Sequence, residues 1–189
     1  MAWARRILRV NLTEGTCKHE PLNMDWAMKY LGQRGLATKY LAEEIDPKVD
    51  PLSPDNKMIM ATGPLTGTAA STAGRYSVIT KGALTGAIAC SNSGGFFGNE
   101  MKNAGYDMII FEGRSPKPVY LMVQDDEAQP MDASASWGQS VRDTEGGIKA
   151  AHGHPPIRVA AVGVSAAQGG PFRAGGHHRH RAAGRCRVR

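Results

Sequence analysis

The stretch KMIMATGPLTGTAASTAGRYSVIT, residues 57–80, decides the fold of this 189-residue chain. Residues 57–63 and 76–80 are short apolar runs of the length expected for strands. The part from Gly63 to Arg75 holds three glycines and several hydroxyl residues. We therefore expect two strands joined by a long glycine-rich loop, with the rest of the chain built around them.

The loop from Gly63 to Arg75 is a candidate anion site. Backbone N–H groups and hydroxyls in such a loop can surround an anion, and an arginine binds phosphate through a bidentate fork. The loop has neither the G-x-x-x-x-G-K of a Walker loop nor the G-x-G-x-x-G of a dinucleotide-binding fold. A long, well-hydrated loop explains the same residues, so both interpretations stay open on residue types alone.

Upstream, residues 4–12 and 17–22 are expected strands joined by a turn. Residues 26–44 have apolar positions at helical spacing, with Asp25 as the expected cap and GQRG, residues 32–35, as an interruption. Together with the strand at 57–63, this gives the order β-β-α-β.

The same order recurs downstream, ahead of a second glycine-rich loop. Two strands, a helix and a strand are expected at residues 118–124, 128–131, 136–151 and 157–163. Between the two segments we expect strands at 76–80, 86–90 and 108–113 and a short helix at 98–105. Strands and helices do not alternate regularly, so the predicted class is α+β.

The stretch SNSGGFFGNE, residues 91–100, is the second candidate site. Asn92 offers an amide and a carbonyl, while Gly94 and Gly95 let a ligand approach the backbone. A tight turn with Phe96 and Phe97 filling the core is the alternative. On residue types alone both interpretations stay open, and we expect both phenylalanines to face the core.

The net charge of +6 is confined to one end of the chain. Residues 171–189 hold six arginines and no acid, and the remaining 17 basic residues balance the 17 acidic ones. The body therefore has no basic excess to suggest nucleic acid, and an RNA-binding role for the tail is disfavoured. Within this tail, RHRAAGR, residues 179–185, is a third candidate anion site.

Several function classes are not supported by the residues. The three cysteines are far apart and form no C-x-x-C pair, the tail histidines are interleaved with arginines, and no acid, base or nucleophile stands in a catalytic arrangement. We predict no metal ligands and no catalytic residues in this chain. The apolar runs are too short to span a bilayer, so we expect no membrane and a cytoplasmic location.

Six stretches taken together resemble one family, the tungsten-containing aldehyde ferredoxin oxidoreductases, in its N-terminal domain. They are ILRVNLTEG, LGQRGLATKYL, DPLSPDNKMIMATGPLTGT, GRYSVITKGALTG, NSGGFFGNEMKNAGYDMIIFEG and RAAGR. The resemblance implies an oxidoreductase that converts aldehydes to carboxylic acids with ferredoxin as the electron acceptor. It also implies two similar β-β-α-β halves related by a pseudo-twofold, which form the base for a bis-pterin cofactor.

The resemblance further implies the ligands and the residues that contact them. The cofactor would be a tungsten (or molybdenum) bis-pterin whose phosphates are bridged by magnesium, with Arg75 between a pterin and a 4Fe-4S cluster. Asn92, Gly94 and Gly95 would serve one pterin. The other pterin would be served by the second turn: Ala182, Ala183, Gly184 and Arg185.

The chain lacks the cysteine motif with which the family binds its iron–sulfur cluster. The C-x-x-C-x-x-x-C group that binds the cluster is absent, so the cluster ligands are expected outside this chain. We expect a fragment that is inactive alone and acts with the remaining domains, ferredoxin and an aldehyde; a homodimer is an open alternative. A non-catalytic phosphate- or pterin-binding module is the alternative function.

The domain is expected to span residues 1–163, with residues 164–189 as a degraded or out-of-frame end. The motive is the abrupt change to GVSAAQGGPFRAGGHHRH, in which the apolar residues of an expected strand are nearly gone. Resequencing the gene tests this hypothesis, and we expect a frame change near codon 164. An intact single frame encoding these same residues would refute it.

Overall fold

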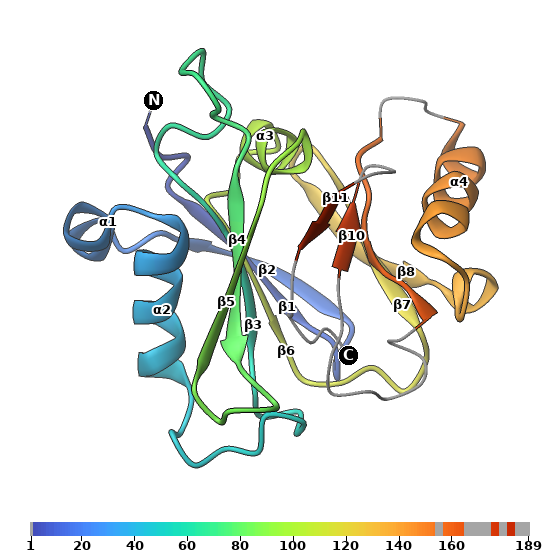
Figure 1. Cartoon of the computed structure of the whole chain (residues 1–189), viewed down its shortest axis with the longest axis horizontal. Helices are drawn as coiled ribbons and strands as arrows, with labels where there is room; N and C mark the ends of the chain where they lie inside the picture. Colours follow the sequence, from blue (N-terminus) through green and yellow to red (C-terminus); the bar gives the residue numbers. More distant parts are fainter. Residues whose placement is uncertain (1, 154–156, 165–174, 178–180, 184–189) are drawn as a thin grey trace.

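The computed structural model describes residues 2–153, 157–164, 175–177 and 181–183 (Figure 1). Its helices are α1 Met24–Tyr30, α2 Gln33–Glu44, α3 Phe97–Asn103 and α4 Val141–His152, with a 3-10 turn at Ser134–Ser136. Its strands are β1 Arg6–Asn11, β2 Thr16–Pro21, β3 Met58–Thr62, β4 Tyr76–Lys81, β5 Ile88–Ser93, β6 Met108–Glu112, β7 Val119–Gln124, β8 Glu127–Asp132, β9 Ala160–Val162, β10 Gly175–His177 and β11 Arg181–Ala183. The α+β class expected from the sequence is confirmed.

A six-stranded sheet forms the centre of the molecule, in the order β2-β1-β6-β3-β4-β5. Only β1 and β6 are parallel, and every other neighbouring pair is antiparallel. The strands β7 and β8 form a separate hairpin, and β9, β10 and β11 form a three-stranded sheet. The central sheet therefore joins the first β-β-α-β segment to the strands that follow it.

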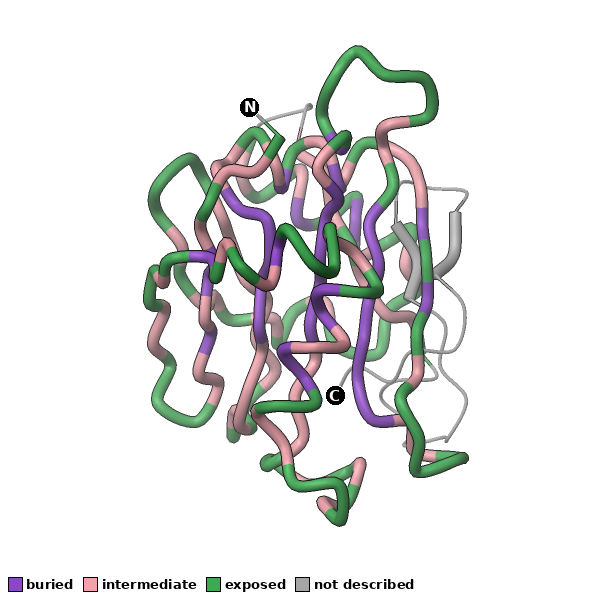
Figure 2. The backbone as a smooth tube through the Cα atoms, turned by 90° about the vertical axis from the view of Figure 1, so that its left-hand side faces the viewer, coloured by how far each residue is buried: buried purple, intermediate pink, exposed green. Residues whose placement is uncertain are grey.

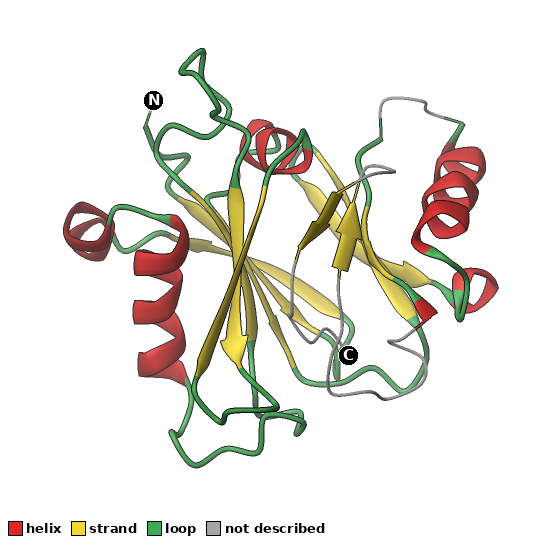
Figure 3. Ribbon diagram, viewed as in Figure 1, coloured by secondary structure: helices red, strands yellow, loops and turns green. Residues whose placement is uncertain are grey.

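Side chains of the central strands alternate between two cores, as the period of a strand requires. One core lies under α1 and α2, where Ile7, Ile59 and Ile79 pack with Leu36 and Leu41. The other contains the intervening residues, among them Leu8, Met60 and Val78, and is covered by α3 and the β7–β8 hairpin. Figures 2 and 3 show this arrangement, with buried segments in the central strands and layers on both sides.

The expected helix at 26–44 is interrupted as predicted, but its cap was assigned wrongly. Asn23, not Asp25, caps α1, because its side-chain oxygen accepts from the Trp26 N–H at 3.0 Å. The interruption falls at Leu31 and Gly32, where Leu31 has a φ of 64°. A Cβ on Gly32 would lie 2.8 Å from the Thr62 carbonyl oxygen, so close packing against the end of β3 fixes the break.

The second segment has the expected order of elements, with a shorter helix. Strands β7 and β8 turn at Asp125 and Asp126, and α4 begins only at Val141, after a cap by Ser140. The backbone of Gly138 has a φ of 77°. This left-handed conformation separates the 3-10 turn at Ser134–Ser136 from α4. The order β-β-α-β is thus present twice, whereas the pseudo-twofold and the boundary at 163/164 stay predictions.

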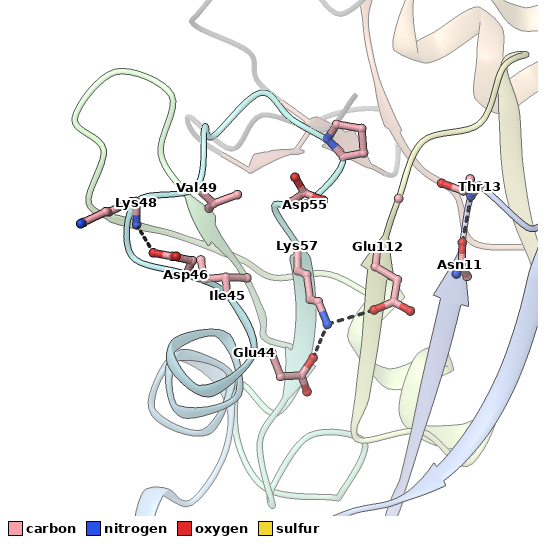
Figure 4. A pocket seen from close by; sticks show the side chains of 12 residues that line it. Asn11, Thr13, Glu44, Ile45, Asp46, Lys48, Val49, Asp55, Lys57 and Glu112 are labelled. Atoms are coloured by element: carbon pink, nitrogen blue, oxygen red, sulfur yellow. Dashed lines mark hydrogen bonds and ion pairs between the residues drawn. The ribbon is translucent and has the colours of Figure 1, made fainter.

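A charged cluster closes one end of the central sheet on the α2 side. Arg9 pairs with Glu20 at 2.7 Å and Glu44 at 2.8 Å, and Lys57 pairs with Glu44 at 2.7 Å and Glu112 at 3.0 Å. Figure 4 shows Lys57 between its two carboxylates. Burial opposes ionisation of Glu44, but hydrogen bonds from Arg9 and Lys57 outweigh it and lower the pKa of this carboxyl.

Glu44 should make stability depend on pH. Because its folded-state pKa lies below the unfolded value of about 4.3, its contribution is present at neutral pH and lost as the pH falls through the folded pKa. Glu44→Gln should lower the free energy of unfolding at pH 7 by about 1–3 kcal/mol and flatten its decline in acid. Urea unfolding from pH 7 to pH 3 measures both effects.

Glu43→Gln is the matched control, because Glu43 is exposed and pairs only with Lys39 among the described residues. It should follow the wild-type pH dependence. Equal acid profiles for Glu44→Gln and the wild type would contradict the assigned role of the cluster.

Candidate functional site

The two candidate loops predicted from the sequence meet at the other end of the central sheet. Thr62, the last residue of β3, pairs with Tyr76, the first of β4, and Tyr76 pairs with Ser93, the last of β5. The loop that ends in Arg75 and the turn after Ser93 therefore emerge side by side, as the neighbouring strands in Figure 1 show.

Arg75 and Asn92 are in direct contact. The Arg75 guanidinium donates to Asn92 Oδ1 at 2.6 Å, and both residues are exposed. Asn92 belongs to β5 and not to the following loop, so its side chain is held by the sheet register opposite Ser77. The sheet register thus brings the first and second candidate segments together.

A third residue, Gln33, is hydrogen-bonded to both Arg75 and Asn92, and the sequence did not predict it as a site residue. Asn92 Nδ2 donates to Ser77 Oγ at 3.1 Å and to Gln33 Oε1 at 3.4 Å, and Gln33 Nε2 donates to the Arg75 carbonyl at 3.1 Å. Arg75, Asn92 and Gln33 form a closed set of three hydrogen bonds, which we call the Arg75–Asn92–Gln33 ring. The GQRG motif was the available signal, but it indicated only a break in the helix.

The hydroxyls of the loop hold the loop itself. The Gly63 N–H donates to Thr66 Oγ1 at 3.0 Å, and this hydroxyl donates to the Arg75 carbonyl at 2.9 Å. Thr68 donates in the same way to the Leu65 carbonyl at 2.8 Å. The expectation that such hydroxyls surround an anion is therefore wrong for Thr66, which is buried and fixes the position of Arg75.

The glycines bring the two loops into backbone contact. A Cβ on Gly74 would lie 2.4 Å from the Gly95 carbonyl oxygen, and a Cβ on Gly98 would lie 3.0 Å from the Gly74 carbonyl oxygen. Gly95 has a φ of 103°, which a residue with a side chain rarely adopts. Gly95 thus supports the contact between the loops, and Gly94 lies half-buried beside it.

The two phenylalanines have different environments, so the expectation that both face the core is half wrong. The Phe97 ring lies 5.2 Å from the ring of buried Tyr76 and packs on the second core. Phe96 is 50% exposed, because it precedes α3 and points away from that core. Its ring lies 4.9 Å from the guanidinium carbon of Arg158.

Arg158 places a second cation beside the Gly94–Gly95 turn. Arg158 Nε is buried and has no hydrogen-bond partner among the described residues. Asn99 Oδ1, in α3, is also buried and without such a partner. Asn99 lies near Gly74, 3.7 Å from the position of a Cβ there. No motif in the sequence connected either residue with this end of the sheet.

The third candidate site is described only in part. β11 contains Ala182 and Ala183, and it contacts β5, the strand of Asn92. Gly184 and Arg185 lie outside the described residues. The backbone of Ala182 and Ala183 is thereby brought to the same edge of the central sheet as Asn92.

A cavity lies elsewhere, beside the charged cluster. It measures about 660 Å³ and its lining includes Glu44, Lys57 and Glu112 (Figure 4). Lys57 precedes β3, whereas the Arg75–Asn92–Gln33 ring lies beyond the other end of that strand. Two of the carboxylates at this cavity, Glu44 and Glu112, form ion pairs with Arg9 and Lys57, so we do not assign it as the site.

Nothing in the described part of the chain forms a metal or cluster site. No group of three or more His, Cys, Asp or Glu side chains converges within it. Cys17 is half-buried in β2 and burial raises the pKa of its thiol, while Cys90 is exposed in β5. Among the same residues, no helix has the length and apolar character needed to cross a bilayer.

Comparison with known proteins gives consistent matches. Residues 7–188 match the family model described as "Aldehyde ferredoxin oxidoreductase, N-terminal domain". Tungsten-containing aldehyde ferredoxin oxidoreductases from Pyrococcus abyssi and Thermococcus kodakarensis are 52% and 49% identical over 183 residues. Each match covers 97% of this chain and 30% of the relative, so the chain spans about a third of these proteins.

Two further matches are to proteins named for other activities. An aliphatic sulfonate oxidoreductase subunit of Pyrococcus furiosus is 36% identical over 140 residues, or 72% of this chain and 22% of the relative. The active-site complex BamBC of benzoyl coenzyme A reductase, solved with 1,5-dienoyl-CoA, superposes with a TM-score of 0.94 at 35% identity. That match covers 97% of this chain and 28% of the solved chain.

The contact between Gly74 and Gly95 can be tested by substitution. Gly74→Ala should destabilise the protein by about 1–3 kcal/mol, because its methyl group would meet a backbone carbonyl that cannot rotate away. Gly146→Ala is the control: nothing lies within 4 Å of a Cβ there, in α4, and stability should rise by up to about 1 kcal/mol. Thermal unfolding measures both, and an unchanged Gly74→Ala protein would contradict the contact.

Proposed function

The chain belongs to the aldehyde ferredoxin oxidoreductase family as its N-terminal domain, and we propose that it forms the base for a tungsten–pterin cofactor in an aldehyde-oxidising enzyme. The observation that carries this proposal is the Arg75–Asn92–Gln33 ring at the end of β4 and β5. It presents an arginine where the two loops meet, beside β5, the strand that β11 contacts.

The residues at this end suit the phosphate of a pterin cofactor. Arg75 is exposed, and among the described residues its guanidinium donates only to Asn92, so further N–H groups are left for an anion. No carboxylate in the described part of the chain pairs with it. Arg158 adds a second positive charge beside the glycine turn. The donor set is therefore cationic and not already neutralised.

We propose that Asn92, besides the contact with a pterin that the resemblance implies, also orients Arg75. Its Nδ2 is occupied by Ser77 and Gln33 and its Oδ1 by Arg75, so its side chain orients the arginine. Gly94 and Gly95 keep the adjacent backbone free of side chains. We propose that Arg75, the glycine turn and the Ala182–Arg185 turn hold the cofactor, with magnesium bridging its phosphates.

The bound tungsten centre would supply the oxidation of the aldehyde to the carboxylic acid, while this chain supplies position and charge. No cysteine set for a 4Fe-4S cluster converges among the described residues, and we place the ligands of that cluster outside this chain. The relatives are about three times as long, which implies that the remaining domains of the enzyme complete the site. We propose ferredoxin as the electron acceptor and a cytoplasmic location.

The relatives favour aldehydes over other substrates. The tungsten-containing aldehyde ferredoxin oxidoreductases are 49–52% identical to this chain, whereas the sulfonate and benzoyl coenzyme A enzymes are 36% and 35% identical. A non-catalytic pterin-binding module is the second candidate, since no catalytic arrangement of side chains is found among the described residues. Aldehyde-dependent reduction of ferredoxin by the full-length protein separates the two.

Arg75→Ala and Asn92→Asp test the cofactor site in the full-length protein. Loss of the guanidinium removes charge-assisted hydrogen bonds, and a carboxylate at 92 would pair with Arg75 and repel a phosphate. Each should lower bound tungsten and pterin about tenfold after dialysis, consistent with the loss of about 1.4 kcal/mol of binding free energy. Metal analysis and pterin fluorescence measure the content.

Arg142→Ala is the matched control, because Arg142 is exposed on α4. It should retain the wild-type tungsten content. Wild-type content in both Arg75→Ala and Asn92→Asp would overturn the assignment of the site.

A further inference from the structure

The direction of every hydrogen bond in the Arg75–Asn92–Gln33 ring is fixed by its one ionic member. A guanidinium has donors only, so Asn92 must present Oδ1 to Arg75. Asn92 Nδ2 then faces Ser77 and Gln33, which requires Gln33 to present Oε1 to it. Gln33 Nε2 is left to donate to the Arg75 carbonyl, and the ring closes with every partner matched.

The backbone at Gln33 is in a conformation that its own sequence does not favour. Gln33 has a φ of 45° and Leu31 a φ of 64°, both in the left-handed region that residues with a Cβ avoid. Such residues persist where surrounding contacts impose them, and they concentrate at functional sites. Here the imposing contact is Gly32 against Thr62 and Gly63.

The same contact directs the Gln33 side chain across the start of the loop. Gln33 Cγ and Nε2 lie 3.6 and 3.5 Å from the position of a Cβ on Gly63. The side chain thus reaches from the first residue of α2 to the two residues that flank the site. It connects the end of β3, the start of β4 and the edge strand β5.

A neutral amide is chemically suited to this position. A carboxylate would hold Arg75 more strongly but would also neutralise it, which would weaken its attraction for a phosphate. Gln33 and Asn92 orient the guanidinium and the adjoining carbonyl without adding negative charge. The arginine is therefore fixed in place while its positive charge remains available.

From these observations we propose that Gln33 is a positioning residue of the cofactor site, which fixes Arg75 and Asn92 relative to each other before a pterin phosphate binds. The inference rests on the proposed function. It predicts that the side chain at 33 affects cofactor retention through Arg75, although Gln33 itself need not touch the cofactor.

The test uses the full-length protein, produced with tungstate and dialysed, with tungsten and pterin content as the readout. Gln33→Ala should lower retention about fivefold, the equivalent of one hydrogen bond of about 1 kcal/mol. Gln33→Glu has the same shape but repels the Arg75 carbonyl and adds a negative charge to the ring, so it should lower retention at least as much. The control Gln139→Ala, whose side chain among the described residues bonds only to the Ala135 carbonyl, should retain the wild-type content.

The outcomes separate the inference from the proposed function. Wild-type tungsten and pterin in both Gln33 variants, with loss in Arg75→Ala, would overturn the role of Gln33 and leave the site intact. A lower melting temperature with unchanged cofactor content would equally show a merely structural residue and overturn it. If Arg75→Ala also retains the cofactor, the proposed function fails. Loss in both Gln33 variants at temperatures well below unfolding supports the inference.

Discussion

The hydrogen bond from the Arg75 guanidinium to Asn92 Oδ1, 2.6 Å long, is the interaction on which the account of this site depends. It joins a loop to an edge strand without a carboxylate, and three separate constraints make it possible. The register of β4 and β5 places Asn92 opposite Ser77. Gly74 and Gly95 allow the loops to touch, and the break between α1 and α2 delivers Gln33. Each constraint comes from a different part of the chain.

The two ends of the central sheet differ in whether their charged side chains form ion pairs. Around Arg9 and Lys57 every carboxylate is paired, and the cluster ties β1, α2, β3 and β6 together. At the opposite end, the Arg75 guanidinium is oriented by the neutral Asn92 Oδ1, and Arg158 has a buried Nε without a partner among the described residues. Ion-paired charges suit a cluster that connects elements of the fold. An arginine without a carboxylate partner suits the binding of an anionic ligand.

Much of the fold was predictable because it is encoded locally. The strands, the interrupted helix and the repeated order of elements follow from short apolar runs, and the interruption was marked by GQRG. What failed depended on contacts between distant segments. Asn23 replaced Asp25 as the cap, Phe96 faced outward, and Gln33 became part of the site only because Gly32 packs on Thr62. Arg75 and Asn92 were found through resemblance to a family; their contact is set by the sheet register.

The most direct measurement is a structure of the purified full-length protein with its native cofactor. The account predicts electron density for a pterin phosphate within hydrogen-bonding distance of the Arg75 guanidinium, at the edge formed by β4, β5 and β11. It also predicts that Gln33 still donates to the Arg75 carbonyl in that structure. A cofactor bound at the cavity beside Glu44 and Lys57, with Arg75 facing solvent, would contradict it.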